Sequence, residues 1–209
     1  MNTKIIKATG AADPIIAQAG NLLRNGRLVA FPTETVYGLG ANGLDPAACQ
    51  KIFEVKGRPP DKPLTLHVSS RKMINFIAEV NPIAERLIEK FFPGPLTLIL
   101  PKRPSVPDAI SRGLPTVGVR MPANEIALAM ISAAGMPIAA PSANISDRPA
   151  PTTAQAVLSD LGGKIPLILD GGTCRLGRAS TIVDVSTEDW KVIRPGVITR
   201  AMLAAVIKN

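Results

Sequence analysis

Hydrophobic and polar positions along the chain change repeatedly between a helical spacing and the shorter alternation of strands, with no repeat or low-complexity stretch. Asp-Pro or Asn-Pro pairs at residues 13, 45 and 81 add the N-cap and first-turn signals of helix starts. The pattern predicts helices at 13–25, 45–55, 70–78, 81–92, 124–134 and 152–161 and a short one capped by Thr199, and strands at 27–31, 64–68, 96–100, 116–121, 137–140, 166–170, 181–185 and 190–194. This alternation is typical of a single α/β domain with a twisted mixed sheet.

A basic segment precedes the strand predicted at 64–68. Lys56, Arg58 and Lys62 fall close together, separated by a glycine and two of the segment's prolines, so the segment is predicted to be a stiff loop and not a helix. Clustered cations with little freedom suit a polyanion such as a nucleotide triphosphate, because arginine supplies a planar fork and lysine a point charge. The alternative is a solvated basic loop without a ligand.

Composition agrees with an anionic partner. The net charge is +8, and residues 51–120 carry twelve Lys and Arg against six acids. Aromatic residues make up only 3% of the chain, which favours contact with phosphates over stacking with bases.

The cysteines and the N-terminus point to a cytoplasmic, membrane-free protein. Cys49 and Cys174 are too few for a disulfide framework, and with a single histidine a resident metal site is not expected. The N-terminus lacks the apolar run of a signal peptide, and no apolar run reaches the length of a membrane span.

Two segments imitate nucleotide-binding motifs. Residues 38–43 satisfy G-x-G-x-x-G, but six residues separate them from the preceding strand and the next helix starts only after Asp45. Residues 172–178 nearly match a P-loop, but Arg178 stands where lysine is required and a strand follows. Neither segment is interpreted as a nucleotide site.

Short polar turns at predicted strand ends remain as candidate chemistry. Residues 32–40 place two hydroxyls, a carboxylate and a phenol on a glycine-terminated turn, and further turns hold Ser142 with Asn144, Ser180 with Thr181, and Arg194. Each alone is more often a turn or cap residue. Strand ends in open α/β sheets usually bind ligands, so together with the basic loop they indicate one site.

In this order, residues 31–39, Lys56-x-Arg58-x₄-Pro63, Ser142-x-Asn144, Ser180-Thr181 and Arg194-Pro195-Gly196 closely resemble the YrdC-like family, the threonylcarbamoyl-AMP synthases. The resemblance implies one α/β domain with a basic concave cleft. It also implies condensation of L-threonine, bicarbonate and ATP to threonylcarbamoyl-AMP with release of pyrophosphate, with Mg²⁺ accompanying ATP. A separate tRNA-modifying transferase would then use the product.

The resemblance assigns roles to particular residues. Lys56 and Arg58 are the implied catalytic residues, and no general base is evident. The implied ATP contacts are Arg58, Lys62, Thr116, Ser142, Asn144 and Arg194. The implied threonine contacts are Thr35, Tyr37, His67, Arg120, Ala140 and Ser180, with Arg120 suited to the carboxylate.

Alternatives stay open from the sequence. A non-catalytic protein could use the basic cleft to bind tRNA or double-stranded RNA, and weak tRNA binding could also accompany synthesis. A carbamoyl-adenylate enzyme of metal-centre maturation would need partner domains. Residues 1–209 are interpreted as one YrdC-like domain without the second C-terminal domain of many relatives, in either a short-form member or a fragment.

Overall fold

The strands form one mixed sheet in the computed structural model, which describes residues 2–208. Parallel pairs join β1 to β8, β8 to β2, β4 to β6 and β5 to β9, and the other neighbours are antiparallel. In sheet order the strands are β1 (Lys4–Lys7), β8 (Leu167–Asp170), β2 (Val29–Phe31), β3 (Gly38–Asn42), β7 (Ile138–Ala139), β4 (Thr65–His67), β6 (Thr116–Arg120), β5 (Leu96–Pro101), β9 (Thr181–Asp184) and β10 (Lys191–Arg194). The predicted α/β class with a mixed sheet is confirmed.

The helices begin where the sequence placed their caps. Asp13 accepts a hydrogen bond from the Ile15 amide, Asp45 from two amides of the first turn, and Asn81 from the Ala84 amide. The helices are α1 (Pro14–Arg24), α2 (Pro46–Lys56), α3 (Arg71–Ile77), α4 (Pro82–Phe91), α5 (Asp108–Ser111), α6 (Glu125–Ala134), α7 (Ala154–Leu161) and α8 (Arg200–Ile207). Helices α1, α2 and α4 begin with proline, which has no amide N–H. An amide N–H at that position would have no partner within the helix.

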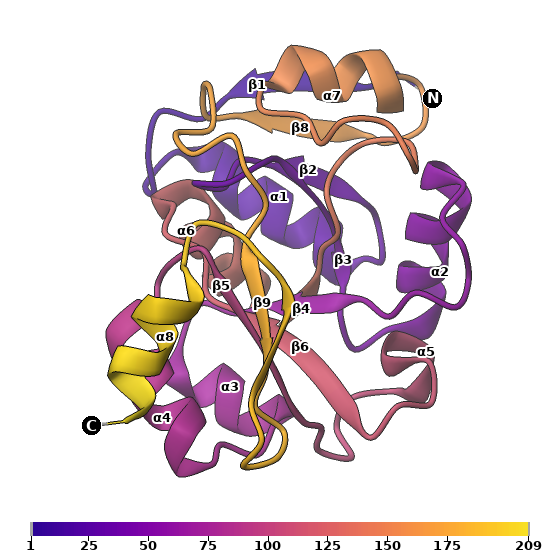
Figure 1. Cartoon of the computed structure of the whole chain (residues 1–209). Coiled ribbons are helices and arrows are strands. Elements are labelled where there is room, and N and C mark those ends of the chain that lie inside the picture. The colour runs from indigo at the N-terminus through magenta and orange to yellow at the C-terminus, as the bar shows by residue number, and fades with distance from the viewer. Residues whose placement is uncertain (1, 209) are drawn as a thin grey trace.

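Two apolar clusters pack on the sheet. One contains the buried faces of α1 and α6, which contact each other, together with side chains from β2 and β8. The larger cluster gathers side chains from α2, α3, α4, α5, α7 and α8 and from most of the strands, β2 and β8 included. Figure 1 shows α3, α4 and α8 grouped at one end of the molecule and α1 with α6 beside the strands β2 and β8. No helix among residues 2–208 is long and apolar enough to cross a membrane.

Three elements were not predicted: β1, β3 and α5. Strand β3 is glycine-rich, which disfavours a strand on propensity alone. Its glycines admit close neighbours, because a Cβ on Gly38 would lie 3.0 Å from the Phe31 ring and one on Gly43, just after the strand, 2.7 Å from the Pro137 carbonyl oxygen. The G-x-G-x-x-G pattern therefore reflects close packing in the sheet.

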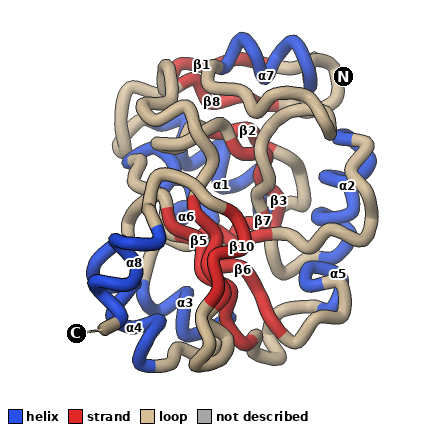
Figure 2. Tube along the Cα trace, viewed as in Figure 1, coloured by secondary structure: helices blue, strands red, loops and turns tan. Residues whose placement is uncertain are grey.

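The order of strands brings distant segments to one place. Strands β8 and β9 follow each other in sequence but are separated by six strands in the sheet. The connection from β8 to β9 can be followed by its colour in Figure 1, where it crosses between the upper and lower strands, and Figure 2 shows the same view with loops in tan. This connection brings Ser180 next to strand β5, where the Thr181 amide donates to the Pro95 carbonyl.

Candidate functional site

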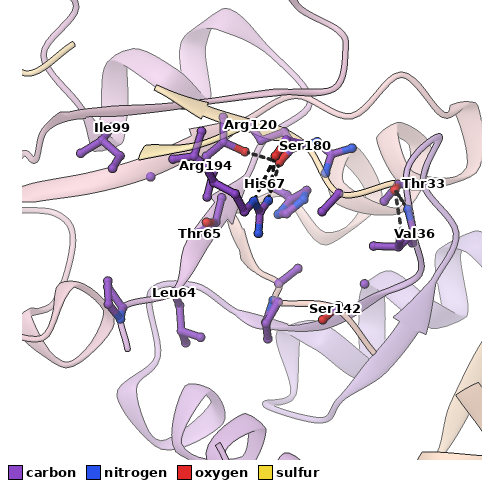
Figure 3. A pocket seen from close by; sticks show the side chains of 18 of the residues that line it. Thr33, Val36, Leu64, Thr65, His67, Ile99, Arg120, Ser142, Ser180 and Arg194 are labelled. Atoms are coloured by element: carbon purple, nitrogen blue, oxygen red, sulfur yellow. Dashed lines mark hydrogen bonds between the residues drawn. The ribbon is translucent and has the colours of Figure 1, made fainter. Parts of the chain in front are cut away.

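A cavity of about 430 Å³ opens where the ends of several central strands meet the turns that connect them. Three arginines and one histidine line it, and none of the described lining residues is an aspartate or a glutamate. It includes most of the sequence-predicted site residues: Tyr37, Arg58, His67, Thr116, Arg120, Ala140, Ser142, Ser180 and Arg194. In Figure 3, Arg120, Ser180 and Arg194 gather on one side, and Leu64 and Ser142 lie across from them.

Arg120 is held at one end of the cavity by the turn that follows β2. Its Nη2 donates to Thr35 Oγ1 at 2.8 Å and lies 2.9 Å from Glu34 Oε1. The Thr35 hydroxyl is itself 2.8 Å from Thr33 Oγ1, which also accepts from the Thr35 and Val36 amides. Thr35 does not line the cavity, so its contact is with the arginine. Burial lowers the pKa of Arg120, and the charge of Glu34 opposes that effect.

His67 stands opposite Arg120 in the register of β4 and β6. Its ring meets Phe31 edge-on, with ring centroids 6.1 Å apart. Burial, and next the charge of Arg120, lower the pKa of His67 to about 3. The imidazole is therefore neutral near pH 7 and a poor proton acceptor.

Arg194 and Ser180 form the second polar group of this end. Arg194 Nη2 donates to the Ser180 carbonyl at 2.9 Å and to its hydroxyl at 3.1 Å. The Ser180 hydroxyl is 2.9 Å from Thr97 Oγ1 on β5. Burial lowers the pKa of Arg194, and the charge of Arg120 adds to the effect. Two cations, Arg120 at the end of β6 and Arg194 at the end of β10, therefore line the same cavity, an arrangement that attracts anions.

Arg58 supplies the cation at another part of the cavity. Gly57, with φ of 58°, ends α2 in the left-handed conformation and turns the chain so that Arg58 lines the cavity. Arg58 Nη2 donates to the Pro63 carbonyl at 3.1 Å, which fixes the guanidinium across the proline-rich loop. Burial lowers the pKa of Arg58, and Arg112 adds to this by like-charge repulsion.

Lys56 lies elsewhere than the sequence predicted. The prediction of a loop position is wrong, because Lys56 is the last residue of α2 and is only 2% exposed. Its Nζ donates to the carbonyl oxygens of Ser142 and Asn144, and it does not line the cavity. The lysine therefore fastens the turn that presents Ser142, since an ammonium group has three donors and these carbonyls accept two of them.

Two more predicted contacts lie outside the cavity lining. The Asn144 amide group donates to the Ile145 and Arg148 carbonyls, at 2.8 Å each, and so shapes its own turn. Lys62 is exposed on the basic loop and does not line the cavity. A direct contact of Asn144 or Lys62 with ATP stays a prediction.

The sequence prediction included Thr33 and Glu34 in the candidate turn without giving either a role, and it did not include Thr97. All three are buried. Thr33 and Thr97 line the cavity and hydrogen-bond with Thr35 and Ser180, and Glu34 lies behind it in an ion pair with Arg120. The signal for Glu34 was its place between two threonines after a buried strand, where a solvated carboxylate is unusual. Thr97 gave a weaker signal, a single hydroxyl within an apolar strand. Within residues 2–208 no three His, Cys, Asp or Glu side chains gather as a metal site.

Comparison with known proteins places the chain. Residues 21–196 match the model of the Sua5/YciO/YrdC family, described as "Telomere recombination". The threonylcarbamoyl-AMP synthase of Pyrococcus abyssi is 52% identical over 190 residues, which are 90% of this chain and 56% of that protein. The putative threonylcarbamoyl-AMP synthase of Methanocaldococcus jannaschii is 36% identical, covering 86% of this chain and 84% of that one.

A solved structure agrees with these sequence matches. P. abyssi Sua5 complexed with L-threonine superposes with a TM-score of 0.95 at 49% identity, over 98% of this chain and 61% of that one. The chain is an α/β protein with a cavity lined by three arginines, and it belongs to the Sua5/YciO/YrdC family. It spans a little more than half the length of the P. abyssi protein.

Proposed function

We propose that this chain carries the activity of a threonylcarbamoyl-AMP synthase: it condenses L-threonine, bicarbonate and ATP to threonylcarbamoyl-AMP and pyrophosphate. One observation carries the proposal. A single cavity holds Arg120 beside buried hydroxyls and, at another part of its lining, Arg58 on a stiffened loop. These are separate cationic positions, one for a carboxylate and one for phosphates. The names of the curated relatives and the threonine complex of P. abyssi Sua5 support the same reading.

The lining residues divide between two substrates under this proposal. Arg120 binds the threonine carboxylate, and Ser180, His67, Tyr37 and Ala140 shape the space around the amino acid. The nucleotide occupies the remainder, in contact with Arg58, Thr116, Ser142 and Arg194.

The reaction needs positioning and fixed charge more than proton transfer. The threonine nitrogen forms a bond with the carbon of bicarbonate while one carbon–oxygen bond of bicarbonate breaks, and that oxygen leaves as water with a proton from the amine. An oxygen of the resulting carbamate attacks the α-phosphorus. The bond from that phosphorus to the β-phosphate oxygen breaks, and pyrophosphate takes the electron pair. Arg58 stabilises the charge that develops on the leaving group, as preorganised cations do in phosphoryl transfer.

Magnesium enters this proposal as part of the ATP substrate. The described lining has no carboxylate that could hold a cation by itself. Mg²⁺ binds through substrate phosphates and water with few protein ligands, so it would arrive and leave with the nucleotide. The product is a reactive mixed anhydride, which fits transfer of its threonylcarbamoyl group to tRNA by a separate transferase.

The test measures pyrophosphate released from ATP while threonine and bicarbonate are omitted in turn. Release is expected only when both are present. Equal release without an amino acid would contradict the proposal. Because the chain covers little more than half of some relatives, the assay should use the full-length protein if a longer form exists, beside residues 1–209.

A further inference from the structure

Glu34 is a buried carboxylate directly behind the cavity. Its residue is 3% exposed, and the side chains of Glu34 and Arg120 keep only 2% and 6% of their surface. Glu34 does not line the cavity, whereas Arg120 does. Its position is fixed by the main chain, because its carbonyl accepts from the Leu176 amide at 2.8 Å. The loop between β8 and β9 therefore holds the glutamate in place.

The contact between Glu34 and Arg120 is electrostatic in character. Glu34 Oε1 lies 2.9 Å from Arg120 Nη2, but neither carboxylate oxygen has a hydrogen bond of acceptable geometry within residues 2–208. Thr35 Oγ1 takes the well-formed hydrogen bond from the same nitrogen. Thr35 and Glu34 thus contact the same guanidinium nitrogen, and Glu34 adds the negative charge. At this burial such a charge acts strongly on its neighbour.

Other groups near Arg120 do not replace that charge. Arg194 adds a like charge from the neighbouring part of the cavity, and His67 is a neutral ring in the opposite strand. Cys174 interacts with both members of the pair, but burial raises the pKa of its thiol and keeps it uncharged near pH 7. Glu34 is thus the countercharge of Arg120 among the described residues in contact with it.

A cavity of this kind meets a selection problem if the proposed function holds. It must bind a carboxylate at Arg120 in the presence of bicarbonate, triphosphate and cellular anions. A buried arginine without a countercharge would bind any small anion that reached it, because an unpaired buried charge is costly. Wrong anions at Arg120 would compete with the amino acid.

We infer that Glu34 is a positioning and specificity-determining residue: with Thr35 it holds the guanidinium of Arg120, and it offsets the arginine's charge so that a simple anion binds weakly there. Threonine overcomes this weakening through its other contacts, with its amine and hydroxyl. A simple carboxylate has no such contacts. This inference rests on the proposed function only in naming threonine as the favoured ligand.

The test uses acetate as a probe on the free protein, with binding followed by calorimetry and by thermal shift. Glu34→Gln keeps the side-chain size and removes the charge, so acetate should bind about tenfold more tightly than to the wild type. Glu85→Gln is the matched control: it removes a carboxylate paired with Arg71 at a partly exposed site, and acetate affinity should not change.

Two further variants make the result decisive. In Glu34→Gln combined with Arg120→Gln the tight acetate binding should disappear, because the attracting cation is gone. Glu34→Asp keeps the charge but moves it away from Arg120, so acetate affinity should rise only a few-fold. This variant carries the test if Glu34→Gln does not fold. Wild-type acetate affinity in the folded Glu34 variants would overturn the inference.

The amino-acid arm tests specificity directly. The ratio of threonine affinity to acetate affinity should fall in Glu34→Gln, whereas a purely structural role would weaken threonine binding and leave acetate unchanged. Acetate binding requires no turnover, and the proposed function is judged by pyrophosphate release from the wild type. The two ideas therefore fail separately.

Discussion

Burial sets the chemistry of the single residues in this cavity. His67 is 4% exposed and Arg120 is 5% exposed, and they face each other across two paired strands. One stays neutral because burial and a neighbouring cation lower its pKa, and the other stays charged beside a countercharge. On a solvated surface, a histidine would change its charge close to neutral pH.

The stability of the protein should therefore depend on pH through His67. The histidine has a pKa near 6.5 when unfolded and about 3 when folded, so the unfolded state binds the extra proton between these values. Stability rises with pH in that window and is lost as pH falls below about 6.5. The free energy of unfolding in urea should fall between pH 7 and pH 5 for both proteins. This fall should be about 2 kcal/mol smaller for His67→Asn than for the wild type.

The variant removes the only histidine, and both proteins share the same carboxylates, so the difference isolates this group. Identical pH dependence of the two unfolding free energies would show that His67 takes up a proton in the folded state.

Arg58 should matter more for turnover than for ATP affinity. Charge moves onto pyrophosphate as it leaves, and Arg58→Ala removes donors that bind the transition state more tightly than the ground state. Turnover should fall roughly ten- to a hundredfold, as expected for one charged hydrogen-bond partner. Arg58→Lys should recover part of the loss, because the planar fork is missing. The measurement is the kcat and KM for ATP in the pyrophosphate assay.

Arg71→Ala is the control, since Arg71 lies outside the cavity lining in a half-exposed ion pair. If Arg58→Ala lost threonine binding but kept ATP turnover, the assignment would be reversed: threonine would bind near Arg58 and the nucleotide near Arg120.

At the scale of elements, the end of α2 and the turn after β7 act as one unit. Lys56 joins them through two carbonyl oxygens, and the Ser146 amide returns a hydrogen bond of 2.9 Å to the Lys56 carbonyl. The Ser142 turn also pairs with the start of β3 through a bridge between Gly38 and Ser142. The Ala143 amide donates to the carbonyl of Tyr37, just before that strand, at 2.9 Å. A lysine in a helix thus positions a hydroxyl that lines the cavity.

Lys56→Met should destabilise the fold and loosen this turn. Methionine fills similar space without donors, and the two carbonyls lose their partner, at a cost of about 2 kcal/mol or more in unfolding free energy. Lys51→Met on the same helix is the matched control, because Lys51 is exposed and its Nζ donates to the single Gly26 carbonyl at 2.8 Å. The control should lose less than about 1 kcal/mol. An unchanged unfolding free energy with abolished turnover would instead assign Lys56 to the phosphates.

At the scale of the whole molecule, the net charge of +8 gives the protein an attraction for polyanions beyond its cavity. The only tryptophan has Arg200 over its ring, 4.8 Å from guanidinium carbon to centroid, and the only tyrosine is fully buried. Few aromatic rings remain to stack on bases, which leaves contacts with phosphates as the main basis for binding RNA.

Binding to tRNA should therefore be weak and strongly dependent on salt. Phosphate contacts release counterions, so the logarithm of the affinity should fall steeply and linearly with the logarithm of salt concentration. Filter binding or fluorescence anisotropy over a salt series measures this slope. An affinity that hardly changes between low and physiological salt would indicate base recognition and would favour an RNA-binding role.

Much of the architecture could be predicted because local signals and periodicity agreed. Caps at Asp13, Asp45 and Asn81 predicted the starts of three helices, and apolar runs predicted most strands. The glycine-rich β3 could not be predicted from propensity, because the reason for its glycines is the neighbouring strands. Most of the predicted site residues line the cavity, since short polar turns at strand ends meet in an open sheet.

The sequence alone determined the fold class, the family resemblance and the residue types of the proposed phosphate- and carboxylate-binding site, because these depend on local pattern and motif order. Tertiary structure decided which cations line the cavity. Lys56 and Arg58 are two residues apart, yet the end of α2 and the left-handed Gly57 turn one toward buried carbonyls and the other into the cavity. It also placed Glu34 behind Arg120, across more than eighty residues of sequence. Charge pairing over such separations depends on packing, which no local pattern records.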